Sequence, residues 1–253
     1  MRLLTTIACL LLVLAATLHA SPAPDQLFAR AAQAYDAGQF PQAAAAYDSL
    51  IQQGYHSAEI YFNLGNAHFR SGDIGHAIWS YRAAQQLAPR DPDITANLTV
   101  ARLAARDRIE SLAPGFWKQT WQSVSTILTF DEGAWLVTGS WCALWLLIAG
   151  WLFARSLRRW WETGLRFVGT AWLLASLVFG GRYLEVHNTT HAVVIATETQ
   201  ALSGPGDEFD NVFAGHAGLE CTIRGRRNGF LLVKLANGRV GWVLEADLAI
   251  VPT

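Results

Sequence analysis

Residues 58–89 read AEIYFNLGNAHFRSGDIGHAIWSYRAAQQLAP, and this stretch decides the fold of the N-terminal part of the chain. Gly72-Asp73 interrupts its helical pattern, and Pro89 ends the pattern because proline lacks the backbone N–H that a helix needs. Small side chains at Gly65 and Ala77 let two antiparallel helices approach closely. Four residues at helical spacing fill the seam between these helices: Tyr61, Leu64, Tyr81 and Ala84. The stretch therefore predicts a helical hairpin.

The pattern recurs at a spacing of 34 residues, which is the length of the tetratricopeptide repeat (TPR). The positions that carry this resemblance are Leu64-Gly65, Gly72-Asp73, Ala77, Tyr81, Ala84 and Pro89. A weaker copy precedes it, in which Arg30 replaces the usual leucine. The chain thus resembles a TPR solenoid over residues 24–108, with repeats at 24–57 and 58–91. A helix at 92–108 caps the last apolar face.

In TPR proteins the first helix of each pair lines a concave groove that holds extended peptides, so the resemblance implies a peptide-binding surface. Its candidate residues are Tyr35, Phe62, Asn63, Asn66, Phe69, Arg70 and Asn97. Asn97 stands 34 residues after Asn63, at the equivalent repeat position. An asparagine side chain both donates and accepts hydrogen bonds, so it can bind a peptide backbone without reading sequence. In the alternative interpretation, these polar residues only solvate a helix face.

The overall composition separates the chain from several classes of protein. It has 253 residues, with 19 Lys and Arg against 20 Asp and Glu, and only 15% of its residues are charged. The near-zero net charge argues against a nucleic-acid-binding protein, which needs a dense basic face. Of 11 tryptophans, nine lie between Trp117 and Trp172. Because indole rings prefer the boundary between water and lipid, this crowding indicates a membrane-associated middle region.

Residues 1–20 have the pattern of a secretory signal peptide: Met1-Arg2, a long apolar run, and the small residue Ala20 before a proline-rich break. The alternative is an uncleaved anchor helix, although the apolar run is shorter than the roughly 20 residues that a membrane span needs. The cysteines Cys9, Cys142 and Cys221 fall in three different parts of the chain. We therefore expect no structural disulfide.

Two apolar segments predict a transmembrane hairpin. Residues 133–154 carry no charge over 22 positions, which is long enough to span a bilayer. Residues 165–184 form the second predicted span, for which an interfacial or buried helix is the alternative. Four arginines lie in the connecting segment, 155–166: Arg155, Arg158, Arg159 and Arg166. The positive-inside rule places this loop in the cytoplasm and both soluble parts in the periplasm.

The segment before the first span, residues 113–130, is moderately apolar and carries Trp117 and Trp121 four positions apart. This spacing puts both indoles on one side of a helix. We expect an amphipathic helix lying on the outer face of the membrane, between the repeats and the first span. Packing of this helix against the repeats is the alternative.

Residues 191–253 change to short β-branched runs and many glycines, which are typical of strands and turns. The predicted strands include 192–197, 219–223, 230–235 and 239–243. Asn237-Gly238 predicts a two-residue hairpin between the last two, because both residues tolerate positive φ. The turn at 202–206 and the closing hairpin through Trp242 resemble the bacterial SH3-like domain. The resemblance implies a small all-β barrel. We expect Trp242 in its core, and a place on a ligand-binding surface is the alternative.

No pattern for catalysis is evident in the sequence. The chain has no nucleophile–histidine–acid set and no phosphate-binding glycine loop, and it has no charge within 133–154 or between Arg166 and Arg182. His68 and His76 occupy repeat positions, where we expect them to pack or to face solvent. The sequence therefore predicts a non-enzymatic protein with no catalytic residues, no metal site and no cofactor.

The order of the parts predicts a multidomain membrane protein: an all-α TPR solenoid, an α-helical transmembrane hairpin and an all-β SH3-like small barrel. This order resembles the BatE-type proteins of bacterial aerotolerance operons over the whole chain. The resemblance implies an inner-membrane scaffold acting in oxygen or stress tolerance. Its implied partners are other Bat proteins, proteins with von Willebrand A domains and a MoxR-type ATPase. Two alternatives are an envelope sensor that binds peptidoglycan through the SH3-like domain, and an assembly factor for a secreted or respiratory complex.

Overall fold

The structure is a computed structural model that describes residues 24–252, except for 108, 110–114, 126 and 154–157. The predicted signal peptide at 1–20 lies outside the described residues. So does Arg155, one of the arginines of the predicted cytoplasmic loop. The chain divides into two compact units, Met1–Ala101 and Arg102–Thr253, and each has its own architecture.

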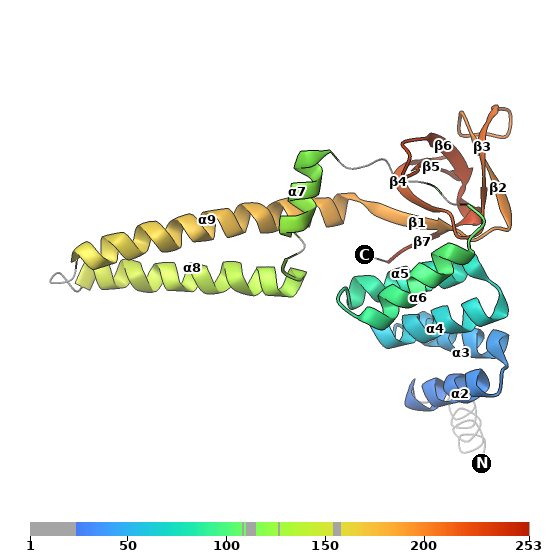
Figure 1. The fold of residues 1–253 in the computed structure, drawn as a ribbon, viewed down its shortest axis with the longest axis horizontal. Coiled ribbons are helices and arrows are strands. Elements are labelled where there is room, and N and C mark those ends of the chain that lie inside the picture. Colours follow the sequence, from blue (N-terminus) through green and yellow to red (C-terminus); the bar gives the residue numbers. More distant parts are fainter. Residues whose placement is uncertain (1–23, 108, 110–114, 126, 154–157, 253) are drawn as a thin grey trace, which may run out of the picture. The chain divides into compact units, whose positions relative to one another are not determined.

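The first unit is built from short helices that pack in sequence order (Figure 1). Their bounds are Pro24–Asp36 for α2, Phe40–Gln52 for α3, Ala58–Ser71 for α4, Ile74–Leu87 for α5 and Pro92–Ala104 for α6. Helix α2 packs against α3, α3 against α4, and α4 against α5. These are the helical hairpins that the repeat pattern predicts. Helix α6 ends at Ala104, short of the predicted end of the capping helix at residue 108.

Local sequence signals explain where α4 and α5 begin and end. The Ser57 hydroxyl accepts a hydrogen bond from Ile60 N at 3.2 Å and so caps α4. Asp73 caps α5 in the same way, through a 3.2 Å bond from His76 N. Gly72 has a φ of 84°, the left-handed conformation that glycine adopts without strain. The break predicted at Gly72-Asp73 is therefore confirmed.

Tyrosines form much of the core of the first unit. Tyr47, Tyr61 and Tyr81 are each no more than 2% exposed. Tyr47 meets the ring of Phe28 edge-on, with the ring centroids 5.6 Å apart. The residues predicted to fill the seam between α4 and α5 are all buried. Because each aromatic side chain buries roughly 150–250 Å² of surface, these rings contribute strongly to the helix packing beside the buried alanines and leucines.

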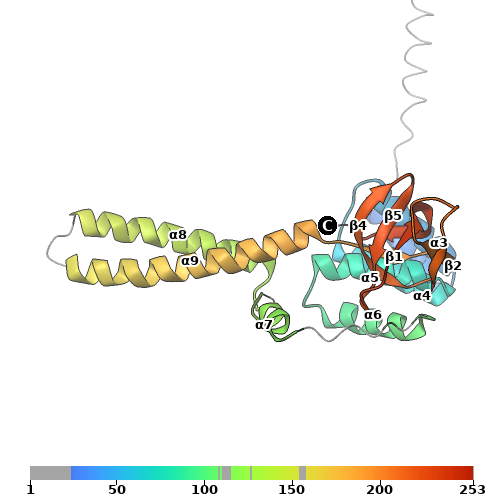
Figure 2. The ribbon, with the colours of Figure 1, turned by 90° about the horizontal axis from the view of Figure 1, so that it is seen from above.

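Two long apolar helices dominate the first part of the second unit. Helix α8 covers Phe130–Phe153 and α9 covers Arg158–Asn188. The two lie side by side along their length in both views (Figure 1 and Figure 2). Both are long and apolar enough to cross a membrane, and their most apolar stretches are not buried inside the protein. Glycine permits their close approach, since a Cβ at Gly150 would lie 2.7 Å from the Trp161 ring.

Helix α9 begins inside the predicted loop at 155–166, so that segment is helical from Arg158 onward. Arg158 makes two contacts at this start. Its guanidinium carbon lies 4.8 Å from the centroid of the Trp151 ring, and its Nε lies 3.4 Å from an oxygen of Glu162, one turn further on. These contacts join the end of α8 to the start of α9. The second helix thus extends beyond the predicted span at 165–184 on both sides.

Helix α7, Phe116–Ser125, lies within the segment that is expected to be amphipathic and interfacial. Trp121 Nε1 donates a 3.0 Å hydrogen bond to Glu185, and the same indole covers Gly181 of α9. Phe116 and Trp117 are 70% and 82% exposed. Helix α7 thus packs against α9 and leaves two large apolar side chains uncovered. Its place at a membrane surface stays a prediction.

The C-terminal part of the second unit is a seven-stranded sheet. Its strands are β1 (Thr190–Val194), β2 (Glu198–Leu202), β3 (Asn211–His216), β4 (Glu220–Arg227), β5 (Phe230–Lys234), β6 (Val240–Leu244) and β7 (Leu248–Ile250). They pair antiparallel in the order β3-β2-β6-β5-β4-β1-β7. The strands predicted from the sequence do not include β2, β3 or β7. Closure of the sheet into an SH3-like barrel stays a prediction.

The two-residue hairpin predicted at Asn237-Gly238 is wrong. Leu235 N donates to Arg239 O at 2.9 Å, so the loop between β5 and β6 comprises the three residues 236–238. Gly238 has a φ of 87°, whereas the Asn237 side chain accepts a hydrogen bond from Arg239 N at 3.1 Å and holds a local Asx turn. A three-residue loop with glycine in the left-handed position results.

The two-residue turn with positive φ lies instead between β4 and β5. Arg227 pairs with Phe230 across this turn. Asn228 and Gly229 have φ values of 52° and 77°. Both Asn-Gly dipeptides therefore make turns, and the register of the flanking strands decides which type each one makes.

The prediction that Trp242 lies in the core is also wrong. Trp242 is half-buried and lies outside the core cluster of the sheet, whereas its neighbours Gly241 and Val243 on β6 are buried. Alternation along the strand therefore points the indole to the other face.

Cys221 lies in the core of the sheet. Burial, with the Glu220 charge, raises the pKa of its thiol to about 12.

The buried phenol of Tyr47 gives a test of the core of the first unit. Burial, with smaller effects from Glu59 and Asp36, raises the pKa of Tyr47 from 10.0 to about 12. The folded state therefore holds this proton more tightly than the unfolded state, and the resulting stability is complete below pH 10 and lost as the pH rises toward 12. We expect the difference in tyrosinate absorbance between the wild type and Tyr47→Phe to have a midpoint near 12.

The urea-unfolded protein is the control, and its difference titration should have a midpoint near 10, the value of a free phenol. A midpoint near 10 in the folded protein as well would contradict the burial of this side chain.

Candidate functional site

A cavity of about 150 Å³ opens in the first unit. Its lining comes from α2, α4, α5 and α6: Tyr35, Asn66, Phe69, Arg70, Tyr81, Asn97 and Val100. The α4 members are three and four positions apart, so they share one face of that helix. Five of the seven residues predicted to bind a peptide line this cavity: Tyr35, Asn66, Phe69, Arg70 and Asn97.

Asn66 is the centre of the polar network in the cavity. Its Oδ1 accepts a hydrogen bond from the Tyr81 hydroxyl at 2.7 Å and another from Asn97 Nδ2 at 2.8 Å. These bonds fix the orientation of both amide groups. They leave Asn66 Nδ2 as a donor and Asn97 Oδ1 as an acceptor, neither with a partner among the residues that the structure describes. One residue of an extended peptide, whose N–H and C=O point to the same side, has the complementary pair of groups.

Gly65 determines how closely α4 approaches α5 beneath this network. A Cβ at Gly65 would lie 2.6 Å from both Cδ1 and Cε1 of Tyr81, far inside normal contact distance. The Tyr81 ring is 1% exposed and its hydroxyl is bonded to Asn66, so the ring has no room to move. Glycine at position 65 therefore lets the Tyr81 hydroxyl reach Asn66.

Two predicted site residues lie outside the lining of the cavity. The Phe62 ring packs against Tyr81, with centroids 6.0 Å apart. Asn63 is half-buried on α4 and is not among the lining residues. Conversely, Tyr81 and Val100 line the cavity and are absent from the prediction. Repeat spacing predicts Tyr81 only as a residue packed between α4 and α5. Its hydroxyl extends past this helix contact and reaches Asn66 in the cavity.

The electrostatics of the cavity are simple. Among the described residues that line the cavity, Arg70 alone is charged, and its guanidinium carbon lies 4.6 Å from the centroid of the Phe40 ring. Burial, followed by the effect of Tyr35, raises the pKa of the Tyr81 phenol, so this hydroxyl stays protonated and donates to Asn66. The lining therefore offers neutral hydrogen-bonding groups, aromatic surface and one positive charge.

The size of the cavity limits what it can hold. Pockets for small molecules and cofactors typically measure about 300–1,000 Å³. The cavity here, at about 150 Å³, is smaller than that range and larger than the roughly 30 Å³ that one water molecule occupies in the liquid. It suits a peptide unit with one side chain better than a whole metabolite.

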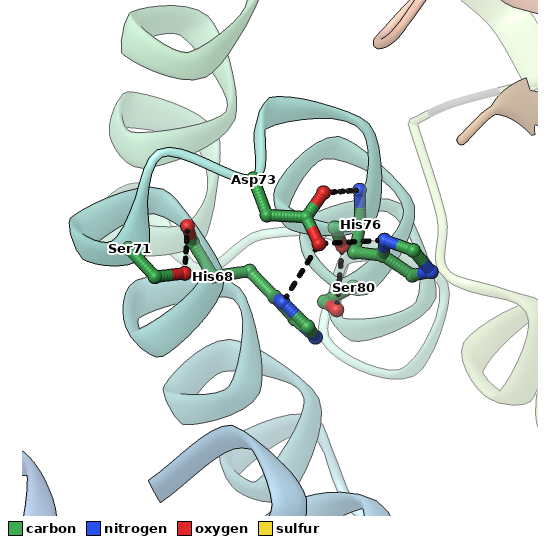
Figure 3. A network of polar contacts seen from close by, with 5 residues as sticks. All are labelled: His68, Ser71, Asp73, His76 and Ser80. Carbon is green, nitrogen blue, oxygen red and sulfur yellow. Dashed lines mark hydrogen bonds and ion pairs between the residues drawn. The ribbon is translucent and has the colours of Figure 1, made fainter. Parts of the chain in front are cut away.

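A second polar cluster lies in the turn between α4 and α5 (Figure 3). Asp73 Oδ2 lies 3.4 Å from His68 Nδ1 and 2.8 Å from His76 Nδ1. The contact with Asp73 raises the pKa of His76 against the opposing effect of burial. Burial would raise the pKa of the Asp73 carboxyl, but the two imidazoles outweigh it and lower that pKa. From the sequence, we expect the two histidines only to pack or to face solvent. The structure shows instead that both contact the carboxylate of Asp73.

Comparison with known protein families identifies the repeats. A tetratricopeptide repeat family model matches residues 28–92, which include α3, α4, α5 and most of α2. Tetratricopeptide repeats are protein–protein interaction modules and are typically non-catalytic. No curated protein matches the sequence.

Enlarging Gly65 tests the packing that positions the site. Helix propensity alone predicts that Gly65→Ala stabilises α4 by about 1 kcal/mol. The contact with Tyr81 predicts a net loss of about 1–2 kcal/mol, because overpacking a closed core costs roughly 1–3 kcal/mol. Amide hydrogen exchange in α4 and α5 of the full chain should therefore quicken about 5- to 30-fold.

Ala45→Gly, on the exposed face of α3, is the matched control for helix propensity. It should lower the stability of α3 by about 1 kcal/mol and leave amide exchange in α5 unchanged. Slower exchange in Gly65→Ala than in the wild type would show that the Tyr81 ring does not confine this position.

Proposed function

We propose that the chain is a membrane-anchored scaffold whose helical repeats hold an extended segment of a partner protein. The observation that carries this proposal is the pair of open hydrogen-bonding groups, Asn66 Nδ2 and Asn97 Oδ1, on two amides that are hydrogen-bonded to each other in the cavity. The match of residues 28–92 to an interaction module points in the same direction.

The chemistry of the lining favours a peptide over other ligands. The amide of Asn97 accepts from a backbone N–H of the partner, while the amide of Asn66 donates to a neighbouring backbone carbonyl. Phe69 and Tyr35 supply apolar and aromatic surface for one side chain. Arg70, exposed at this surface, attracts an acidic residue of the partner. Affinity then comes mainly from backbone contacts, and Arg70 adds a preference for acidic segments.

The anchoring part of the proposal rests on α8 and α9. Large apolar side chains on these helices are exposed, among them Trp135 at 76%, Leu146 at 73%, Phe153 at 87% and Phe167 at 74%. Apolar surface of this extent requires lipid or a protein partner to cover it. A bilayer covers it best, since both helices satisfy their backbone hydrogen bonds internally.

The orientation of the anchor follows from its arginines. Arg158, Arg159 and Arg166 gather at the end where α8 is joined to α9, which favours the cytoplasm for this end. Both soluble parts then lie in the periplasm, next to the bilayer. Anchoring raises the effective concentration of partners in the same membrane. Within the resemblance to BatE-type proteins, these partners are Bat proteins, proteins with von Willebrand A domains and the complex of a MoxR-type ATPase.

The scaffold proposal predicts selective loss of partners. The double variant Phe69→Ala, Asn97→Ala removes the apolar surface and the open acceptor but keeps the hydrogen bond between Tyr81 and Asn66. Full-length protein purified in detergent from its own cells should lose its main co-purifying proteins with this variant. The readout is the set of bound proteins identified by mass spectrometry.

Asn63→Ala is the matched control, because Asn63 lies on the same helix and outside the cavity. It should retain the partners of the wild type. An unchanged partner list in the double variant, or equal loss in the control, would reject the cavity as the binding site.

A further inference from the structure

We propose that His68, Asp73 and His76 form a binding site for one divalent transition-metal ion of the Zn²⁺ class. The three side chains belong to one helix–turn–helix: His68 to the last turn of α4, Asp73 to the position before α5, and His76 to the first turn of α5. Each offers one ligand atom, and the three atoms all lie within 4.8 Å of one another. This site is independent of the proposed peptide-binding function.

The turn between the helices holds the carboxylate in place. Asp73 Oδ1 accepts the capping hydrogen bond from His76 N, which fixes the plane of the carboxylate and turns Oδ2 toward the two imidazoles (Figure 3). The hydroxyls of Ser71 and Ser80 bond to the backbone carbonyls of His68 and His76, each at 2.8 Å. Neither serine therefore competes for the imidazole nitrogens through these bonds.

The contact between His76 and Asp73 is short but does not have the geometry of a hydrogen bond. His76 Nδ1 is shielded from solvent and lies 2.8 Å from Oδ2, yet it makes no hydrogen bond in the part of the chain that the structure describes. An imidazole lone pair facing a carboxylate at this distance is repulsive unless a proton or a cation lies between them. Asp48 of α3 is half-buried and within electrostatic range of both histidines, so it adds to the local attraction for positive charge.

The distances are close to those of a small tetrahedral site. Ligands about 2.0–2.1 Å from Zn²⁺ stand about 3.3 Å apart at tetrahedral angles. The separation between His68 and Asp73 is already 3.4 Å, and that between His76 and Asp73 is 2.8 Å. The two rings are stacked with centroids 5.0 Å apart, so ion binding rotates them until both Nδ1 lone pairs converge beside Oδ2.

The donor set selects the class of ion. Two imidazoles and one carboxylate suit Zn²⁺, Ni²⁺ and Cu²⁺, whereas Mg²⁺ and Ca²⁺ prefer oxygen ligands alone. No thiol or thioether is part of the set, which disfavours Cu⁺. Three protein ligands leave one position of a tetrahedral ion open to water or to a side chain of a partner.

The site is distinct from the peptide cavity. The 3.6-residue period places His68 nearly opposite to Asn66 and Arg70 around α4, and about 100° from Phe69, the third α4 residue of the lining. An ion at the turn cross-links α4 to α5 and stabilises the second repeat by mass action. Metal binding can therefore succeed or fail without any change in partner binding.

Titration of the metal-stripped full chain in detergent tests the proposal. Calorimetry with ZnCl₂ at neutral pH should give one ion per chain. Co²⁺, used as a spectroscopic probe, should give the visible bands of a tetrahedral site that Zn²⁺ then abolishes. Asp73→Asn keeps a good helix cap and removes the anionic ligand, and His68→Gln keeps a helix former and removes an imidazole. Each should weaken Zn²⁺ binding about tenfold or more.

His56→Gln is the matched control, since His56 lies in the same unit and outside the cluster. It should bind Zn²⁺ like the wild type. Melting of the metal-free variants reports whether they fold, and only the wild type and the control should gain stability with Zn²⁺. Absence of binding to the wild type, or undiminished binding in folded Asp73→Asn and His68→Gln, would overturn the proposal.

Discussion

The close contact between Gly65 and the Tyr81 ring is the constraint on which the rest of the site depends. It brings α4 and α5 together tightly enough for the Tyr81 hydroxyl to reach Asn66 at 2.7 Å. That bond, together with the one from Asn97, fixes two amide groups whose remaining donor and acceptor stay open. A looser helix pair would leave these amides free to rotate, and a ligand would have to order them at a cost in entropy. Tight packing thus preorganises the surface to which we propose that a partner binds.

Two features with different physical origins meet in the second repeat. The cavity combines neutral hydrogen-bonding groups with the charge of Arg70, and the turn at the end of α4 holds titratable groups. The turn requires Gly72 with φ of 84° for its geometry and Asp73 for its cap. The same aspartate then attracts His68 and His76. Asp73 therefore both caps α5 and supplies a ligand to the proposed metal site. Its capping role alone does not predict the second role.

The sequence predicts much of the fold because its signals are local and periodic. Repeat spacing, caps and the Gly72-Asp73 break locate the helices of the first unit, and charge-free runs locate α8 and α9. Contacts between distant residues escape such reasoning. The Asn237-Gly238 turn depends on strand register, and the outward position of Trp242 depends on which of its neighbours face the core. In the site, Asn97 can be predicted because it occupies the repeat position equivalent to Asn63. That Tyr81 lines the cavity cannot be predicted in this way, because it depends on where its hydroxyl lies in three dimensions.

A photoreactive phenylalanine in place of Phe69 tests most directly whether a partner occupies the cavity. The replacement keeps an aromatic ring in the lining, and illumination of living cells should cross-link it to a membrane or periplasmic protein. Gln86, exposed on α5, is the comparison position and should give no such adduct. An adduct at position 69 alone agrees with a peptide held between Asn66 and Asn97. No adduct at position 69, or the same adduct from both positions, would contradict it.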